Sequence, residues 1–222
     1  MAFLTHNEAD PPGALGRRAI ELGFEIGVHR ADRGAGELPR PGSFDLLVIM
    51  GSVASTTDHT VPWIPPERRL VAVAVDTGIP VLGVCFGGQL LAQVLGARVS
   101  RASRPERGWH RIDTDDPERV PTGPWLMWHQ DQFTVPPGAV ALARTDVCLQ
   151  AYVLGPHTGV QFHPEVTAEI VGHWIDEARA ASRMDPAEAQ EILSGFDHQG
   201  QGPEDQIRTL FDGFVARAGV AP

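Results

Sequence analysis

The residue best placed for chemistry is Cys85, which stands in the run Gly83-Val84-Cys85-Phe86-Gly87. Glycines two residues before and two residues after a central residue, between an apolar strand and a helix, are typical of a nucleophile elbow. Larger side chains at the glycine positions would collide with the strand or the helix, so the central side chain is held out above the sheet. A helix N-terminus also binds an oxyanion. The pattern predicts that Cys85 is a nucleophile, and the alternative is a buried structural cysteine.

A thiol nucleophile needs a base, and His163 is the best candidate among the nine histidines. It ends a predicted apolar strand, Gly159–Phe162, and the last residue of a parallel strand reaches the same sheet edge as the elbow. Pro164 keeps His163 out of the helical conformation, and Glu165 is near enough in sequence to orient the imidazole. The expected catalytic set is Cys85, His163 and Glu165. Five other histidines lie in polar loops or near the ends of elements and are interpreted as solvated: His6, His29, His59, His157 and His198.

Two other arrangements use some of the same residues. In an α/β-hydrolase the acid comes between nucleophile and histidine, so Asp131 or Asp146 would be the acid and His163 would come last. The segment before the elbow is short for that fold. A metal site could be built from His129, Asp131 and His163, but the tight ligand spacing of known metal motifs is missing.

The elements that must position these residues follow an α/β order in the first half of the chain. Phe44–Met50 and Pro80–Cys85 are largely apolar, as expected when helices cover both faces of a sheet. Further strands are predicted at Ala2–Thr5 and Phe24–Val28, with helices near residues 15–22, 66–77 and 87–95.

The second half of the chain reads differently. Short strands, expected to be antiparallel, are predicted at Arg98–Arg111, Trp125–Trp128, Ala139–Thr145 and Ala151–Leu154. A strand at Val160–His163 and a helix at Thr167–Arg183 follow, and then a helical tail over 185–222 with a link at Gly200–Gly202. We therefore predict a single α/β domain over residues 1–222, with a mostly parallel central sheet, helices on both faces and a small antiparallel portion.

Composition excludes several classes of function. The net charge of −10 has the wrong sign for binding a phosphate backbone, so we expect no nucleic-acid partner. The longest apolar runs are too short to span a bilayer, and no secretory signal opens the chain. All 18 basic residues are arginines, which excludes the lysine chemistry of Schiff bases and P-loops. We expect a cytoplasmic protein, and the abrupt start of its first strand at Met1 suggests that the natural start lies upstream.

Two segments resemble the signatures of class I, triad-type glutamine amidotransferases: Pro80–Gln89, which reads PVLGVCFGGQ, and Gly159–Glu165, which reads GVQFHPE. Leu47–Ser55 resembles the oxyanion-loop segment of that family, and Trp128–Phe133 resembles its His-x-Asp segment. The matching stretches cover roughly residues 45–174. The closest resemblance is to stand-alone proteins similar to the amidotransferase domain of GMP synthetase.

The resemblance implies a flavodoxin-like fold and a glutaminase that needs no cofactor and no metal. Cys85 would attack the side-chain amide of glutamine, His163 would act as base and then acid, and Glu165 would orient the imidazole. A γ-glutamyl thioester would be hydrolysed, and the ammonia would pass to an acceptor or a partner synthetase. The backbone N–H groups of Ser52 and Phe86 would form the oxyanion hole. Four residues match substrate-binding positions of the family: Gln89, Trp128, Gln130 and Asp131.

Three positions depart from the pattern of the family. Ser52 and Val53 follow Gly51 where the family usually has Gly-Gly-Pro, and a non-glycine residue makes a flip of this peptide into positive φ costlier. Gly88 stands where many members have histidine, and Gln130 replaces a common glycine.

No residue of the expected catalytic set is missing, so an active enzyme is the preferred prediction. A γ-glutamyl peptidase with the same catalytic set and a non-catalytic regulatory or binding subunit are the alternatives. Partner contacts are expected at residues 56–66 and in the tail, 185–222.

Overall fold

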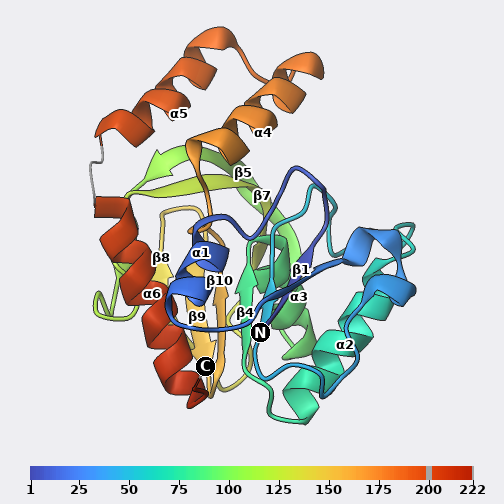
Figure 1. Ribbon diagram of the computed structural model, residues 1–222. Helices are drawn as coiled ribbons and strands as arrows, with labels where there is room; N and C mark the ends of the chain where they lie inside the picture. The colour runs from blue at the N-terminus through green and yellow to red at the C-terminus, as the bar shows by residue number, and fades with distance from the viewer. Residues whose placement is uncertain (199–201, 222) are drawn as a thin grey trace.

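The computed structural model describes residues 1–198 and 202–221, which form an eight-stranded sheet, a smaller sheet, six α-helices and two short 3-10 helices, Ala31–Arg33 and Ala35–Glu37 (Figure 1). The large sheet has the strand order β2-β1-β3-β4-β10-β9-β8-β6. Its strands are β1 (Ala2–Thr5), β2 (Gly27–Arg30), β3 (Leu47–Ile49), β4 (Val81–Val84), β6 (Asp113–Thr114), β8 (Val140–Arg144), β9 (Leu149–Leu154) and β10 (His157–Val160). The first five strands in the sheet order are parallel, and the other three continue it antiparallel. The parallel strands follow the flavodoxin-like order 2-1-3-4-5, and the predicted fold class is confirmed.

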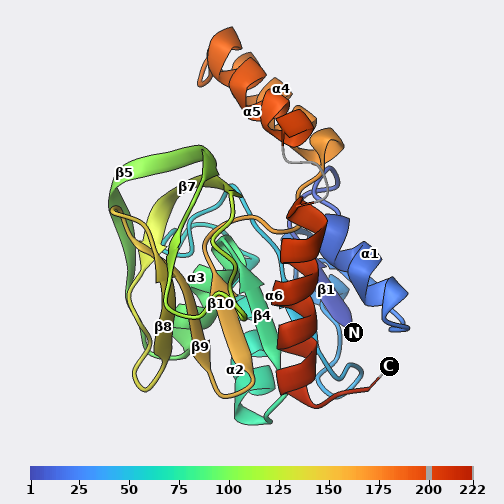
Figure 2. The same ribbon diagram turned by 90° about the vertical axis from the view of Figure 1, so that its left-hand side faces the viewer.

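Helices cover both faces of this sheet, as Figures 1 and 2 show. On one face lie α1 (Gly13–Glu21) and α6 (Gly202–Ala218), and on the other lie α2 (Ile64–Asp76) and α3 (Phe86–Val94). Successive side chains of a strand point to opposite faces of the sheet. In β3, Val48 packs into the core under α1 and α6, while Leu47 and Ile49 pack into the core under α2 and α3. This double burial explains why these strands are apolar throughout.

A second, two-stranded sheet lies at one end of the molecule. It pairs β5 (Val99–His110) with β7 (Trp125–Phe133) in antiparallel register. Helices α4 (Ala168–Ala180) and α5 (Pro186–His198) project beside it in both views and share a small apolar cluster with β7 through Leu126, Val171 and Ile192. Among the helices of the described residues, none is both long enough and apolar enough to cross a membrane.

Two predicted strands lie elsewhere. The segment predicted at Phe24–Val28 starts in the turn that closes α1, where the N–H of Phe24 donates to the carbonyl of Ala19, and β2 begins only at Gly27. The strand predicted at Val160–His163 is β10 (His157–Val160), because a short turn sets its register with β9.

One face of α6, in the C-terminal tail, is buried in the core. Phe211 and Phe214 of α6 are fully buried, and Arg18 of α1 pairs with Asp212. This face of α6 is therefore unavailable for the partner contacts expected over 185–222. The first two residues of the predicted link Gly200–Gly202 lie outside the described residues, and α6 begins at Gly202.

The close approach of α3 to β3 gives a prediction for stability. A Cβ added at Gly87 would lie 2.1 Å from the carbonyl oxygen of Ile49, whereas one at Gly172 in α4 would meet open space. We expect Gly87→Ala to lower the free energy of unfolding by about 1–3 kcal/mol, because the backbone of β3 must shift. The matched control Gly172→Ala should raise it by about 0.5–1 kcal/mol. Chemical denaturation measures both, and equal effects of the two substitutions would contradict the close approach.

Candidate active site

Cys85 occupies a strained turn between β4 and α3. Its backbone has φ 51° and ψ −106°, a positive φ that non-glycine residues rarely adopt, and its N–H donates to the carbonyl of Val160 at 2.8 Å. A Cβ on Gly83 would lie 2.4 Å from the carbonyl oxygen of Gly87, so both glycines of the elbow are sterically required. The same reason accounts for Gly88, where a Cβ would lie 2.5 Å from the carbonyl oxygen of Val160. Strain of this kind concentrates at functional sites.

His163 and Glu165 form a buried pair beside this turn. The Nδ1 of His163 lies 2.7 Å from Oε1 of Glu165, and the two residues are only 4% and 3% exposed. The backbone N–H of His163 donates to Leu126 of β7 at 2.9 Å, while the carbonyl of Glu165 accepts from the N–H of Ala14 at 2.8 Å. The segment after β10 is thus held at both ends, by β7 and by the start of α1.

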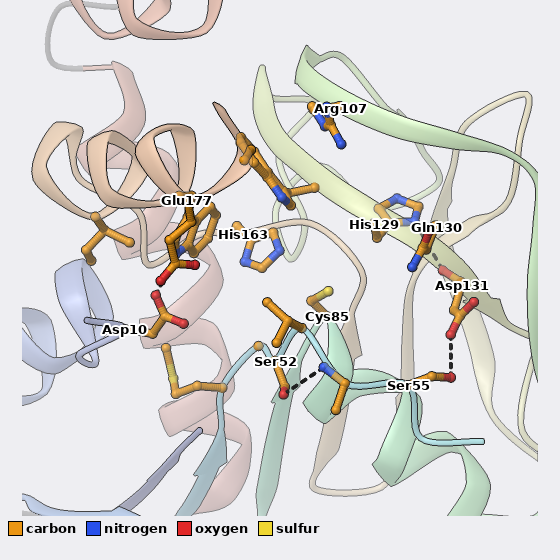
Figure 3. Close-up of a pocket in the computed structure, with 18 of the residues that line it drawn as sticks. Asp10, Ser52, Ser55, Cys85, Arg107, His129, Gln130, Asp131, His163 and Glu177 are labelled. Carbon is orange, nitrogen blue, oxygen red and sulfur yellow. Dashed lines mark hydrogen bonds between the residues drawn. The ribbon is translucent and has the colours of Figure 1, made fainter. Parts of the chain in front are cut away.

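The imidazole of His163 faces the same pocket as the thiol of Cys85 (Figure 3). A Cβ built on Gly51 would lie 3.0 Å from Cε1 of His163 and 3.9 Å from Cβ of Cys85, so Gly51 lies against both. The buried Nε2 of His163 has no hydrogen-bond partner in the described part of the chain. Burial by itself lowers the pKa of His163, but the charges of Glu165 and Cys85 outweigh burial and raise the pKa well above its usual range.

The two expected oxyanion donors come from neighbouring strand ends. Phe86 is the first residue of α3, where a helix leaves its N–H groups without intrahelical partners. Ser52 follows β3 by way of Met50 and Gly51, and its Oγ accepts from the N–H of Ala54 at 3.1 Å. No acceptor among the described residues takes the backbone N–H of Ser52. Both segments border the pocket at the carboxyl edge of the sheet.

The four residues matched to substrate binding all line this pocket. The buried amide of Gln89 donates to the carbonyl of Asp131 at 3.3 Å, and the carboxylate of Asp131 accepts from Oγ of Ser55 at 2.6 Å. Gln130 is exposed, and the guanidinium of Arg107 lies over the ring of Trp128, 5.1 Å from its centroid. The structure therefore gathers these residues on one side of Cys85.

The alternative constellations do not form. Asp146 is exposed and pairs with Arg104 at 2.6 Å, away from the pocket. The carboxylate of Asp131 bonds Ser55 rather than His163. The ring nitrogens of His129 face the carboxylate of Glu106 and the carbonyl of Asp131, which excludes the metal site built from His129, Asp131 and His163.

A second buried cluster lies behind His129. Glu106, His129 and Cys148 bring three possible metal-ligand atoms within 4.8 Å of one another. Oε2 of Glu106 already accepts from Cys148 at 3.4 Å and from Gln150 at 2.8 Å, and burial raises the pKa of the Cys148 thiol. The cluster is a hydrogen-bonded hub around one carboxylate, and Cys148 is buried as expected for a structural cysteine.

Several pocket residues have no counterpart in the sequence motifs. The ring of Trp174 lies edge-on to His163 with centroids 4.8 Å apart, and its indole N–H donates to Asp10. Burial and the nearby Glu165 and Glu177 raise the pKa of Asp10, although the hydrogen bond from Trp174 opposes the shift. Asp10 and Trp174 are 164 residues apart, so no local spacing could have linked them.

Two histidines were also misjudged from the sequence. His6 and His157 are 8% and 6% exposed, so neither is solvated. His6 directly follows β1, the neighbour of β3 in the sheet, and that position at the carboxyl edge was a usable signal.

Most of the chain matches a known protein family. Residues 13–176 match the family described as glutamine amidotransferase class-I. A GMP synthase (glutamine-hydrolyzing) of Thermosynechococcus vestitus is 38% identical over 135 residues, which cover 57% of this chain and 24% of the relative. The corresponding protein of Thermus thermophilus is 35% identical over 160 residues, covering 66% of this chain and 31% of the relative.

Solved structures resemble the chain over nearly its whole length. A glutamine amido transferase from Methylobacillus flagellatus has a TM-score of 0.87 and 29% identity, covering 98% of this chain and 94% of its own. A glutamine amidotransferase from Thermotoga maritima has a TM-score of 0.85 and 26% identity, covering 96% of each chain. The chain belongs to the class I glutamine amidotransferases. It spans only about a quarter to a third of the two GMP synthases, whose coverage is 24% and 31%.

Proposed function

We propose that this protein hydrolyses the side-chain amide of glutamine through a γ-glutamyl thioester on Cys85. The observation that carries the proposal is the buried His163–Glu165 pair, joined at 2.7 Å, beside a cysteine held at positive φ in an elbow. A nucleophile, a base and a group that orients the base are the parts that covalent acyl transfer requires.

The proposed reaction starts from the thiolate–imidazolium pair that forms when the thiol proton of Cys85 moves to Nε2 of His163. The thiolate attacks the amide carbon, and the N–H groups of Ser52 and Phe86 stabilise the oxyanion that forms. His163 then gives its proton to the departing nitrogen, so that ammonia leaves and the thioester remains. Water, deprotonated by His163, hydrolyses the thioester to glutamate. Glu165 keeps Nδ1 protonated and Nε2 facing the thiol throughout.

Substrate binding is assigned to the side of the pocket that holds Gln89 and Asp131. The carboxylate of Asp131 is fixed by Ser55 and offers an anionic partner to the α-ammonium group of glutamine. Trp128 and Gln130 border the same side. The ammonia is proposed to serve a partner synthetase in the cytoplasm, since the relatives named above are glutamine-hydrolyzing GMP synthases several times longer than the matched region.

A γ-glutamyl peptidase is the second candidate, and one observation favours it. The pocket continues past His163 to Asp10 and Glu177, on the side opposite Asp131 (Figure 3). That extension offers room for a leaving group larger than ammonia.

Competing substrates distinguish the two candidates. We expect the purified protein to release ammonia from glutamine with a kcat/KM at least about tenfold above that for γ-glutamyl dipeptides. The reverse preference would support the peptidase. If neither substrate is hydrolysed while Cys85 still reacts with iodoacetamide, the protein is a non-catalytic member of the family.

A further inference from the structure

A buried histidine outside the catalytic set contacts the backbone of the expected oxyanion hole. Nδ1 of His6 lies 2.8 Å from the carbonyl oxygen of Gly51, the residue that precedes Ser52. Nε2 of His6 lies 3.0 and 3.1 Å from the two carboxylate oxygens of Glu67 in the first turn of α2. The side chains of His6 and Glu67 are 1% and 0% exposed, so water does not compete for these bonds.

The partners of His6 define its protonation. A carbonyl oxygen only accepts, so Nδ1 must carry a proton toward Gly51, while Nε2 faces the carboxyl group of Glu67. Burial alone lowers the pKa of His6, but Glu67 and the Gly51 carbonyl outweigh burial and, with a smaller contribution from Asp32, raise the pKa. The ring is therefore held at both nitrogens, by the Gly51 carbonyl and by Glu67. Separating these buried partners would leave polar groups without hydrogen bonds and would cost free energy, so His6 and Glu67 hold each other in place.

The bond to Gly51 sets the direction of the next N–H group. The Gly51–Ser52 peptide is trans, so the N–H of Ser52 points opposite to the carbonyl that His6 holds. Gly51 itself lies against the ring of His163 and Cβ of Cys85. A rotated peptide would present a carbonyl oxygen where the oxyanion needs a donor, and would break the bond from His6.

His6 also contacts the residue that supplies the other donor. Its ring lies edge-on to the ring of Phe86 with centroids 4.8 Å apart, and it stacks on Trp63 at 4.9 Å. One buried histidine ring thus contacts both the loop after β3 and the first residue of α3.

We propose that His6, anchored by Glu67, is a positioning residue that holds the Gly51–Ser52 peptide in the orientation of a formed oxyanion hole. The inference rests on the proposed glutaminase function and deepens it. It also accounts for Ser52 in place of the second glycine of Gly-Gly-Pro. A peptide that His6 holds in one orientation does not need a glycine at position 52 to flip.

Two substitutions at His6 test the proposal with opposite expectations. His6→Asn places an amide N–H near the position of Nδ1 and can still donate to Gly51, whereas His6→Leu removes the donor. Losing one oxyanion donor costs about 10²–10³ in kcat, so we expect His6→Leu to lower kcat for glutamine about ten- to hundredfold with KM changed less than about threefold. We expect His6→Asn to keep kcat within about fivefold of the unsubstituted protein. Equal losses in both variants, or a loss confined to KM, would overturn the proposal.

Glu67→Gln keeps the test decisive if His6→Leu does not fold. The amide can still hydrogen-bond Nε2 through one atom but loses the second carboxylate oxygen that anchors the ring, so kcat should fall in the same direction and KM should stay. An unchanged kcat in this variant would count against the proposal. The rate at which iodoacetamide alkylates Cys85 serves as the control, because alkylation needs the thiol but no oxyanion hole.

Crystal structures of the unsubstituted protein, His6→Asn and His6→Leu give a readout that does not depend on turnover. We expect the carbonyl of Gly51 to point toward residue 6 in the first two and to rotate or occupy two orientations in the third. The same orientation in all three would overturn the inference. If the unsubstituted protein hydrolyses neither glutamine nor γ-glutamyl dipeptides, the proposed function fails, and the three structures still decide the role of His6.

Discussion

Replacing Cys85 with alanine is expected to lower kcat for glutamine by about 10⁴-fold or more. The substitution removes Sγ, the only atom proposed to form a covalent bond with the substrate. The remaining groups can only bind the substrate and polarise its amide. Ammonia release from glutamine, measured at saturating substrate, gives kcat directly. The fold should persist, because alanine lacks only the sulfur atom of cysteine and leaves the backbone of the elbow unchanged.

The second cysteine of the chain supplies the matched control. Cys148 is also buried, 8% exposed, but its thiol donates to Glu106 behind the pocket. Cys148→Ala should leave kcat largely intact while lowering stability somewhat. Comparable losses of kcat in the two variants would mean that the effect of Cys85→Ala is structural.

Glu165→Gln is expected to have the second-largest effect. An orienting carboxylate in a nucleophile–base–acid set contributes up to about 10⁴ in kcat, and we expect a loss of about 10²- to 10⁴-fold here. The neutral side-chain amide that replaces the carboxylate can hydrogen-bond His163 but cannot stabilise its imidazolium. The exposed Glu169, in the first turn of α4, offers a control through Glu169→Gln, which should leave kcat unchanged.

The pH profile gives this variant a distinct signature. Burial lowers the pKa of His163, and the Glu165 charge is the first of the interactions that raise it well above its usual range. The active thiolate–imidazolium pair is lost as pH rises through the pKa of His163, so the alkaline limb of kcat/KM should lie well above the ordinary value of about 6.5. Glu165→Gln removes the raising charge while burial remains, so this limb should move to lower pH. An unmoved limb would show that another group governs it.

The parts of the site that depend on local sterics could be predicted from the sequence. The glycine spacing around Cys85 predicted a tight elbow, and the Cβ positions at Gly83 and Gly87 show the collisions that make it necessary. The apolar strands on either side of that spacing predicted a sheet covered on both faces, which the two cores display. Pro164 and the short distance from His163 to Glu165 predicted a pair that needs no long-range contact, and the two side chains do meet.

The parts that depend on long-range pairing could not be predicted. The apolar run around Val160 indicated a strand ending at His163, but the chain leaves β4 after Val160 and His163 pairs with Leu126 of β7. Only the folded register with β9 and β7 decides where the strand ends. Asp10 and Trp174 likewise reach the pocket from segments with no shared pattern.

His6 illustrates why a polar context in sequence is a poor guide to burial. The residues after it, from Asn7 to Asp10, are mostly polar and suggest a solvated loop. The ring turns inward because Glu67 and the Gly51 carbonyl satisfy both nitrogens, and buried polar groups persist where such partners exist.

The most direct test of the account is labelling with a glutamine-mimicking electrophile, followed by peptide mass mapping of the unsubstituted protein and Cys85→Ala. The account predicts modification confined to Cys85, absent from the alanine variant and suppressed by excess glutamine. Label on other residues, or label on Cys85 that excess glutamine does not suppress, would contradict the claim that Cys85 is the nucleophile of a glutamine site.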